Sequence, residues 1–220
     1  LIRNQIMYIL GQVKNLIQKL RMLNRIKTNK FDDIWVKLHK SVEMISEPNC
    51  PDFYFHGGSL RDIYMGVAPR DYDITTASVS DLTWLISRLQ VMGFIVMAET
   101  DFALKMNFLN TWMDVGVECE SPVDKISKFD FTCNSIAMDN NFKLYYHETT
   151  FEDLDSRRLK QLKTENPVLM DLRKVKFTQK NFKFHNKQDE KKLHKFKLKT
   201  KQLKPSVPFY MDARTYDETS

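Results

Sequence analysis

Apolar side chains recur every three or four residues over the first 27 residues, from Ile6 to Leu23. This spacing predicts one long amphipathic helix with a basic opposite face. We expect the helix to pack on its own domain or on a partner protein. A membrane-surface or targeting helix and direct contact with RNA are the alternatives. A second helix is expected over Phe31–Ile45.

Further along the chain, short apolar runs alternate with helical segments. The predicted strands are Phe53–Phe55, Asp71–Thr75, Phe94–Met97, Phe102–Phe108, Trp112–Glu120, Phe129–Ala137 and Phe142–Tyr146. Helices are expected up to Met65, over Val79–Met92 and from Leu169, with a helix or turn over Phe151–Leu162. Strands separated by helices and then strands in succession predict an α+β fold with a mixed sheet and helices on one side.

The net charge of +6 is unevenly distributed along the chain. Residues 1–31 hold seven Lys or Arg and no acid, residues 32–171 carry a net −10, and residues 172–204 carry +11. Basic arms of this kind meet phosphate or an anionic lipid surface. We therefore divide the chain into an N-terminal helical extension (1–49), a central α+β domain (50–165) and a basic C-terminal extension (166–220).

Composition excludes several classes of protein. A hydrophobic content of 42% is enough to bury a core, which excludes a wholly disordered chain. No apolar run approaches the ~18 residues of a membrane-spanning helix, so no transmembrane segment is expected. Three cysteines without a CxxC pair argue against a disulfide framework and a cysteine zinc site, and favour an intracellular location.

Acidic residues are spaced for metal chemistry in two of the predicted strands. Asp71 and Asp73 point to one face of a strand, where two close carboxylates repel each other unless a cation lies between them. Such oxygen ligands suit Mg²⁺. Alternation places Asp114 on the polar face of its own strand, either beside this pair or simply in solvent. Upstream, Gly57-Gly58 lets backbone N–H groups approach a phosphate, or forms a plain tight turn.

These motifs together resemble a known enzyme family. Phe55–Asp62 followed by Arg70–Thr76 resembles the head-domain signature of class II CCA-adding tRNA nucleotidyltransferases and bacterial poly(A) polymerases, within the polymerase-β-like nucleotidyltransferase superfamily. Asp130–Ala137 is similar to the RRDFTINA motif of this family, and Phe151–Lys160 resembles the stretch that closes its head. The resemblance covers roughly residues 50–178.

The resemblance implies a polymerase-β-like nucleotidyltransferase head, with the N-terminal amphipathic helix and the basic C-terminal arm added to it. It implies transfer of a nucleotide from an NTP to an RNA 3′ end, with Mg²⁺ as cofactor. The implied catalytic residues are Asp71, Asp73 and Asp114, of which Asp71 and Asp73 hold the metal. The implied nucleotide-binding residues are Gly57, Gly58, Arg61, Asp62, Asp130 and Asn134.

The chain departs from the family in its specificity motifs. Phe129 stands where RRDFTINA has its second arginine, and the base-selecting EDxxR motif is missing near Glu165–Arg173, with Met170 at the position of its arginine. Two functions therefore stay open. One is an active nucleotidyltransferase that acts on tRNA or ribosomal RNA. The other is an inactive head that serves as an RNA-binding structural subunit of a large ribonucleoprotein such as a mitochondrial ribosome. The mitochondrial matrix, the cytoplasm and a phage-infected host are all open, and the Phe-, Lys- and Asn-rich composition slightly favours the mitochondrion.

In the basic arm Lys174–Lys204, phenylalanines are interleaved with lysines. Aromatic rings can stack on bases while lysines meet phosphates. Alternatively, the rings dock on the protein and the lysines are solvated. The lysines that we expect to contact RNA are Lys174, Lys176, Lys180, Lys183, Lys191 and Lys192.

Overall fold

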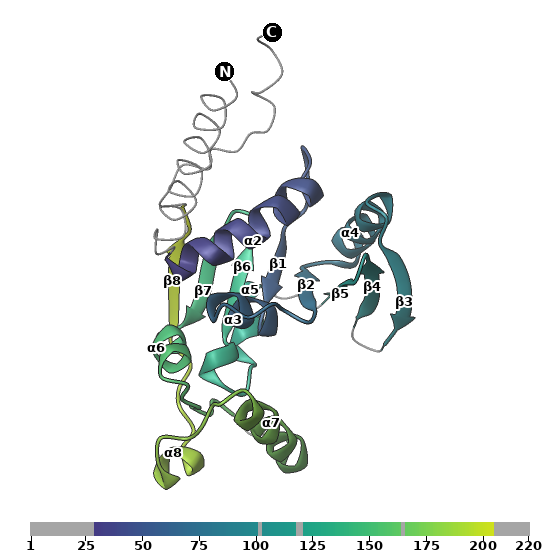
Figure 1. Cartoon of the computed structure of the whole chain (residues 1–220). Coiled ribbons are helices and arrows are strands. Elements are labelled where there is room, and N and C mark those ends of the chain that lie inside the picture. The colour runs from purple at the N-terminus through teal and green to yellow at the C-terminus, as the bar shows by residue number, and fades with distance from the viewer. Residues whose placement is uncertain (1–28, 101–102, 118–120, 164–165, 205–220) are drawn as a thin grey trace, which may run out of the picture.

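The structure, a computed structural model, describes residues 29–100, 103–117, 121–163 and 166–204 (Figure 1). The predicted helix over residues 1–27 lies outside this part of the chain. Within the described residues, no helix combines the length and apolar character needed to cross a membrane.

An eight-stranded mixed sheet forms the centre of the molecule, in the order β3-β4-β5-β2-β1-β6-β7-β8. Its strands are β1 (Phe53–His56), β2 (Tyr72–Thr76), β3 (Ile95–Glu99), β4 (Leu104–Phe108), β5 (Thr111–Val117), β6 (Ile136–Asp139), β7 (Lys143–His147) and β8 (Leu198–Gln202). Strands β2 and β5 pair in parallel, and the other neighbouring strands are antiparallel. The parallel pair arises because α4, β3 and β4 lie between β2 and β5 in the sequence.

Helices cover the sheet unequally on its two faces. The helices are α2 (Lys30–Ile45), α3 (Gly58–Tyr64), α4 (Val79–Val91), α5 (Pro122–Ser127), α6 (Thr150–Asp155), α7 (Pro167–Gln179) and α8 (Lys187–Lys191). Helices α2, α3 and α4 pack on one face over the main core, while the short α5 packs on the other face against β1, β6 and β7 (Figure 1). Much of the second face is therefore left for polar side chains.

Local sequence accounts for where the elements begin and which side they bury. Helix α2 begins after Asn29, which forms a capping box with Asp32. It buries Ile34, Leu38 and Val42, spaced four residues apart on one apolar helix face. Each of these residues is at most 3% exposed. Burial of side chains of this size stabilises the fold by about 1.5–3 kcal/mol each.

The α+β fold with a mixed sheet, predicted from the sequence, is confirmed. The predicted helices over 31–45 and 79–92 are present, and the predicted strands from 53 to 117 appear with bounds shifted by one or two residues at most ends. The strand predicted over Phe129–Ala137 is wrong in its first half, because Thr132–Asn134 forms a 3₁₀ turn and β6 begins at Ile136. The prediction of helices on one side only is also corrected, since α5 lies on the other face.

Much of the basic C-terminal extension packs on the sheet and its helices. Phe177 and Phe182 are 3% and 1% exposed and belong to the main core, so these two rings dock on protein. Residues Leu198–Gln202 form β8, which pairs with β7 at the edge of the sheet. This strand was not predicted, because its alternation of lysine with Leu198 and Thr200 carries too little apolar signal.

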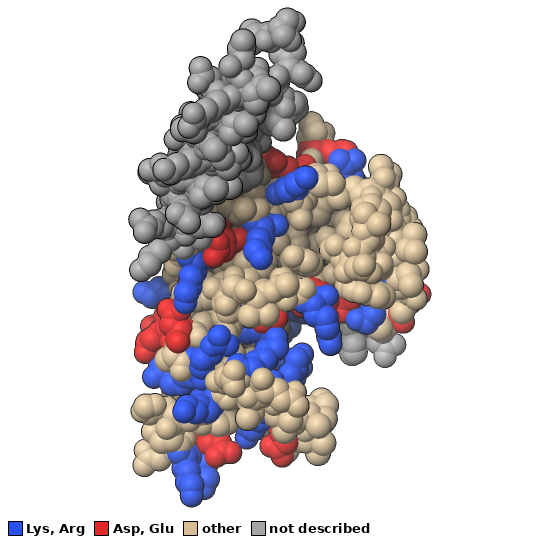
Figure 2. Space-filling model, in the orientation of Figure 1, with Lys and Arg blue, Asp and Glu red and all other residues tan. Residues whose placement is uncertain are grey.

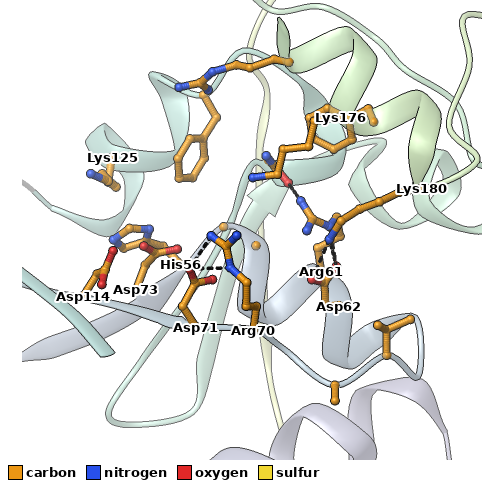
Figure 3. A pocket seen from close by; sticks show the side chains of 18 residues that line it. His56, Arg61, Asp62, Arg70, Asp71, Asp73, Asp114, Lys125, Lys176 and Lys180 are labelled. Carbon is orange, nitrogen blue, oxygen red and sulfur yellow. Dashed lines mark hydrogen bonds and ion pairs between the residues drawn. The ribbon is translucent and has the colours of Figure 1, made fainter. Parts of the chain in front are cut away.

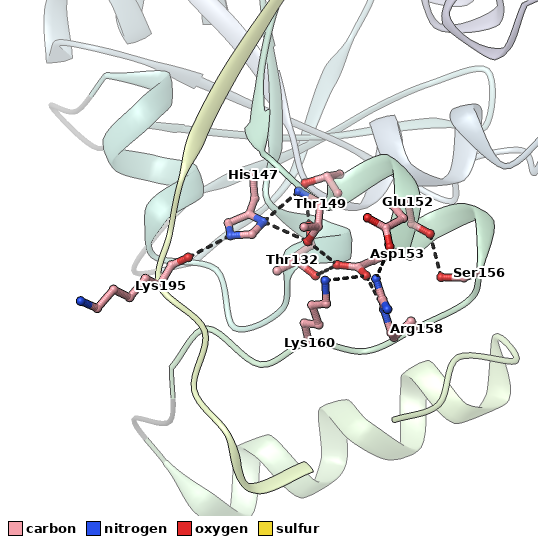
Figure 4. A network of polar contacts seen from close by, with 10 residues as sticks. Thr132, His147, Thr149, Glu152, Asp153, Ser156, Arg158, Lys160 and Lys195 are labelled. Atoms are coloured by element: carbon pink, nitrogen blue, oxygen red, sulfur yellow. Dashed lines mark hydrogen bonds and ion pairs between the residues drawn. The ribbon is translucent and has the colours of Figure 1, made fainter. Parts of the chain in front are cut away.

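Asp153 is the centre of a buried polar network that joins α6 to the 3₁₀ turn and to the following loop (Figure 4). Its carboxylate, 0% exposed, accepts hydrogen bonds from Thr132 Oγ1 at 2.7 Å, Thr149 Oγ1 at 2.6 Å and Arg158 Nε at 2.6 Å. Lys160 Nζ lies 3.4 Å away. These contacts hold residues 132–134 away from the strand ladder, which explains the turn found there.

We predict that Asp153→Ala lowers the free energy of unfolding by about 3–5 kcal/mol, because it leaves buried cations and hydroxyls without their shared acceptor. The matched control is Glu152→Ala. Glu152 accepts from the same arginine at 2.7 Å, but its side chain is 67% exposed, so a loss below about 1 kcal/mol is expected. Urea unfolding at pH 7 measures both variants. Equal small losses would contradict the assignment of Asp153 as a structural anchor.

Candidate functional site

Three carboxylates converge on the sheet face that α5 leaves partly uncovered. Asp71 directly precedes β2, Asp73 lies on β2, and Asp114 lies on β5 directly opposite Asp73 in the parallel register. The neighbours Ile74 and Val115 point to the other face, where they are 1% and 0% exposed in the core. Burial of this apolar pair fixes the side on which Asp73 and Asp114 emerge.

Two of these carboxylates are paired with cations of the same chain. Arg70 Nη2 lies 2.9 Å from Asp71 Oδ2, and Lys105 Nζ on the adjacent strand β4 lies 2.6 Å from Asp114 Oδ2. Asp114 Oδ1 is buried and has no hydrogen-bond partner among the described residues. The structure thus brings together all three acids singled out in the sequence, together with two cations that were not.

The pKa of Asp73 is shifted by its surroundings. Burial raises the pKa of Asp73 to about 6, and the charges of Asp71 and Asp114 act in the same direction. Lys125 and Lys105 oppose this shift. A cation placed between Asp73 and Asp114 would offset the part of this shift that comes from the neighbouring carboxylates.

A cleft of about 670 Å³ opens beside the carboxylates and is bounded on its far side by cations of α7. Arg173, Lys176 and Lys180 line it, at a spacing that brings them to one side of the helix. Figure 3 shows Lys176 and Lys180 across the cleft from Asp71 and Asp73. Partial burial and then the charges of Arg61, Arg70 and Lys180 lower the pKa of Lys176. The cleft therefore has an acidic side and a basic side.

The Arg61-Asp62 dipeptide ties α3 to α7 and to the 3₁₀ turn at the back of the cleft. Arg61 Nε donates to Asp62 Oδ1 at 2.8 Å, and Arg61 Nη1 donates to Asn134 Oδ1 at 2.5 Å. The Arg61 guanidinium lies over the Phe177 ring, 5.5 Å from its centroid. Lys180 Nζ contacts both oxygens of Asp62, at 2.9 and 3.1 Å. Arg61, Asp62 and Asn134 therefore form one connected group at the wall of the cleft.

Of two further predicted positions, Gly57 lines the cleft, whereas Asp130 is not among its lining residues. Gly57 has φ +67°, and a Cβ there would lie 3.3 Å from the Phe129 ring, so this position requires glycine. Gly58 begins α3 and lines the cleft beside it. Asp130 forms an ion pair with Arg173 of α7. The arginine missing at Phe129 is thus matched by Arg173, which lies 43 residues after its partner Asp130 in the chain.

His56 is a functional candidate that the sequence analysis did not single out. It is 7% exposed and lines the cleft beside Asp73. Its Nε2 forms a hydrogen bond with Thr75 Oγ1 at 2.9 Å. Burial and then the charge of Lys125 lower its pKa to about 3. Its Nδ1 is buried without a partner among the described residues. The only sequence signal was its position directly before the glycine pair.

The six lysines expected to contact RNA do not lie together. Lys176 and Lys180 line the cleft, whereas Lys174 lies over Phe184, 5.5 Å from the centroid of that ring. Lys183, Lys191 and Lys192 are exposed in the part of the chain around α8. Lys and Arg side chains gather on the lower part of the molecule in the view of Figure 2, toward α7 and α8. This surface continues the basic side of the cleft.

We predict that Asp73→Asn stabilises the protein at pH 7.5 but not at pH 4. The folded pKa of about 6 exceeds the usual value of 3.8, so the folded state holds a proton that the unfolded chain releases as pH rises. Ionisation of Asp73 therefore destabilises the fold progressively between about pH 4 and 6, and fully above that. A gain of about 1–3 kcal/mol is expected at pH 7.5. Thermal unfolding from pH 4 to 8 measures it, and a difference that is constant with pH would contradict this account.

Solved structures of nucleotidyl-transferring enzymes share this fold. The chain is similar to the Thermotoga maritima CCA-adding enzyme complexed with tRNA (TM-score 0.57, 18% identity), covering 70% of this chain and 40% of that one. It is similar to a CCA-adding enzyme complexed with CTP (TM-score 0.58, 18% identity), covering 69% and 40%. A tRNA-processing enzyme with CTP also matches (TM-score 0.53, 23% identity), covering 64% and 41%. The chain thus spans about 40% of the length of these enzymes, and the likeness establishes a nucleotidyltransferase-like fold.

Sequence comparison matches the chain to one family model. No curated protein matches it significantly. The model of the Gabija anti-defense 2 family matches residues 24–157, which is more than half of the chain and includes all three carboxylates and the glycine pair. The chain therefore belongs to the Gabija anti-defense 2 family.

Proposed function

We propose that this chain is a metal-dependent nucleotidyltransferase of the class II CCA-adding type, which transfers a nucleotide from an NTP to an RNA 3′ end. One observation carries the proposal: Asp73 and Asp114 lie side by side next to Asp71, and they face the cations of α7 across a cleft of about 670 Å³. Acids on one side and cations on the other are what the transfer of a phosphoryl-linked group requires.

The basic side of the cleft fits the triphosphate of the donor. Lys176 and Lys180 offer ammonium groups along one side of α7, and Arg173 continues this row. Partial burial is the largest cause of the lowered pKa of Lys176, and the charges of Arg61, Arg70 and Lys180 add a repulsion that an anion would relieve. Asn134 carries the only side-chain amide among the described lining residues, and its oxygen accepts from Arg61. We infer that the donor is held by its phosphates and that its base is weakly selected.

The acidic side has the donor chemistry for Mg²⁺. Asp73 and Asp114 would hold the ion, with Asp71 as a third ligand, and the unpartnered Oδ1 of Asp114 supports this assignment. As their side chains stand, no three His, Cys, Asp or Glu of the described residues form one metal-binding group. Arg70 and Lys105 pair with Asp71 and Asp114, so a metal ion would have to compete with these two cations. The bound ion would supply charge neutralisation and Lewis acidity.

The chain's own residues would carry the remaining steps. The acceptor oxygen forms a bond to the α-phosphorus, and the bond from this phosphorus to the bridging oxygen breaks, so that pyrophosphate leaves. Lys176 and Lys180 balance the charge that develops on the leaving group. Asp114 Oδ2, the carboxylate oxygen not assigned to the metal, would accept the proton of the acceptor hydroxyl once Lys105 is displaced from it.

A second candidate function is binding of nucleotide or RNA without catalysis, as in a structural subunit of a ribonucleoprotein. The ion pairs Arg70–Asp71 and Lys105–Asp114 favour it, since two of the three acids are already neutralised by the chain. The family description supports a role in countering the Gabija defense for either function. Among the locations left open by the sequence, this role favours the phage-infected host over a mitochondrion.

We predict that the chain incorporates label from an NTP onto the 3′ end of short RNA in the presence of Mg²⁺. The double variant Asp71→Ala/Asp73→Ala should lower the rate by more than about 100-fold, because it removes the charges that organise the reacting groups. Asp52→Ala, an exposed carboxylate in the loop before β1, is the control and should retain full activity. RNA that ends in a 3′-deoxynucleotide should not be extended. If folded protein incorporated no NTP onto any RNA, the binding function would replace the catalytic one.

The donor assignment gives a separate prediction for NTP affinity. Lys176→Gln and Lys180→Gln should each weaken binding by about 10-fold, the usual effect of losing a charge-assisted hydrogen bond. Lys174→Gln is the matched control, since Lys174 lies on the same helix against Phe184. Calorimetry with ATP, GTP, CTP and UTP should give affinities within about threefold of one another. A loss with Lys174→Gln alone, or strong selection of one base, would contradict the assignment.

A further inference from the structure

A second, smaller hollow adjoins the cleft on the other side of the carboxylates. It measures about 270 Å³ and is lined by Arg70, Asp71, Lys105, Trp112 and Asp114. Arg70, Asp71 and Asp114 line both hollows. The carboxylates therefore lie at the junction of two spaces, one bounded by the cations of α7 and one bounded by Trp112. A group-transfer enzyme needs this arrangement, because donor and acceptor must approach the transferred phosphorus from opposite sides.

Strand register places Trp112 within this hollow. Trp112 lies two residues before Asp114 on β5, so both side chains emerge on the same face of the sheet. Lys105 is opposite Asp114 on β4. Because Tyr72 pairs with Met113, the position before it, Asp71, continues the register beside Trp112. Trp112 therefore lies close to both Asp71 and Asp114 on this face of the sheet.

The side chains of this hollow have the chemistry of a nucleotide-binding surface. Trp112 is 38% exposed, although tryptophan usually buries its large apolar ring. Arg70 and Lys105 carry cations beside it, with side chains 84% and 41% exposed. An exposed aromatic ring between cations is the arrangement on which single-stranded nucleic acids stack their bases and place their phosphates.

We propose that this hollow is the acceptor site, and that it takes the 3′-terminal nucleotide of a single-stranded nucleic acid with its base stacked on Trp112. The terminal phosphate would lie toward Arg70 and Lys105, and the 3′-hydroxyl toward Asp71 and Asp114. The proposal deepens the proposed function and rests on it for the direction of transfer. It adds the location of the acceptor and the residue that recognises its base.

The test measures binding of a fluorescein-labelled single-stranded RNA hexamer by anisotropy, without NTP. Trp112→Leu should weaken binding by about 5- to 100-fold, because leucine is apolar but has no ring face for stacking. Trp112→Phe keeps a ring and should stay within about threefold of the wild type. Phe108→Leu is the matched control. Phe108 is also 38% exposed, but it lies on the opposite face of β4, against Phe94, and its substitution should change nothing.

The outcomes separate this proposal from the proposed function. NTP affinity, measured in parallel, should be the same in Trp112→Leu and the wild type, because Trp112 does not line the donor cleft. Hexamer affinity that is equal in Trp112→Leu, Trp112→Phe and the wild type would overturn the acceptor site even if transfer activity is present. Trp112-dependent binding in a protein that transfers no nucleotide would support the site while contradicting catalysis. Absence of hexamer binding, with label transferred to a protein hydroxyl instead, would also overturn it.

Discussion

The parallel register of β2 with β5 is the constraint on which the rest of the site depends. It sets Asp73 directly opposite Asp114 in the interior of the sheet, where two carboxylates repel each other. Burial of Ile74 and Val115 on the opposite face maintains this register, because a slip of either strand by one residue would turn its carboxylate into the core. The apolar packing of α4 and β5 thus sustains an electrostatic arrangement that is unfavourable by itself. That combination is typical of sites built to receive a cation.

Ion pairs within the chain offset this repulsion between the carboxylates only in part. Arg70 and Lys105 pair with Asp71 and Asp114, whereas burial, together with the charges of these two acids, raises the pKa of Asp73 to about 6. A metal ion bound between the acids would compete with both cations, and the freed side chains border the hollow of Trp112. The same cations would then be available to phosphate. Binding of the metal ion is therefore linked to binding of the acceptor by Coulomb interactions alone.

Local patterns predicted most of the fold but few of the long-range partners. The aromatic run of β1, the glycine pair and the alternation around Asp71 and Asp114 were sufficient for the order of elements and for the three acids. Helix α5 was missed although Ser121 and Pro122 form an ordinary helix start, with Ser121 accepting from Asp124 N. The strand over Phe129–Ala137 failed because the hydroxyl of Thr132 donates to Asp153, 21 residues away. The pairs Lys105–Asp114 and Arg173–Asp130 join separate elements, and no local pattern reveals them.

The central claim is that the acids and the α7 cations hold a metal–nucleotide complex between them. Crystals of the chain grown with Mn²⁺ and a non-hydrolysable NTP analogue would test it most directly, through the anomalous scattering of the metal. The account predicts a metal peak bounded by Asp71, Asp73 and Asp114, with the triphosphate extending to Lys176 and Lys180. An analogue bound elsewhere, or bound with Arg70 and Lys105 still paired to the acids and no metal peak, would contradict it.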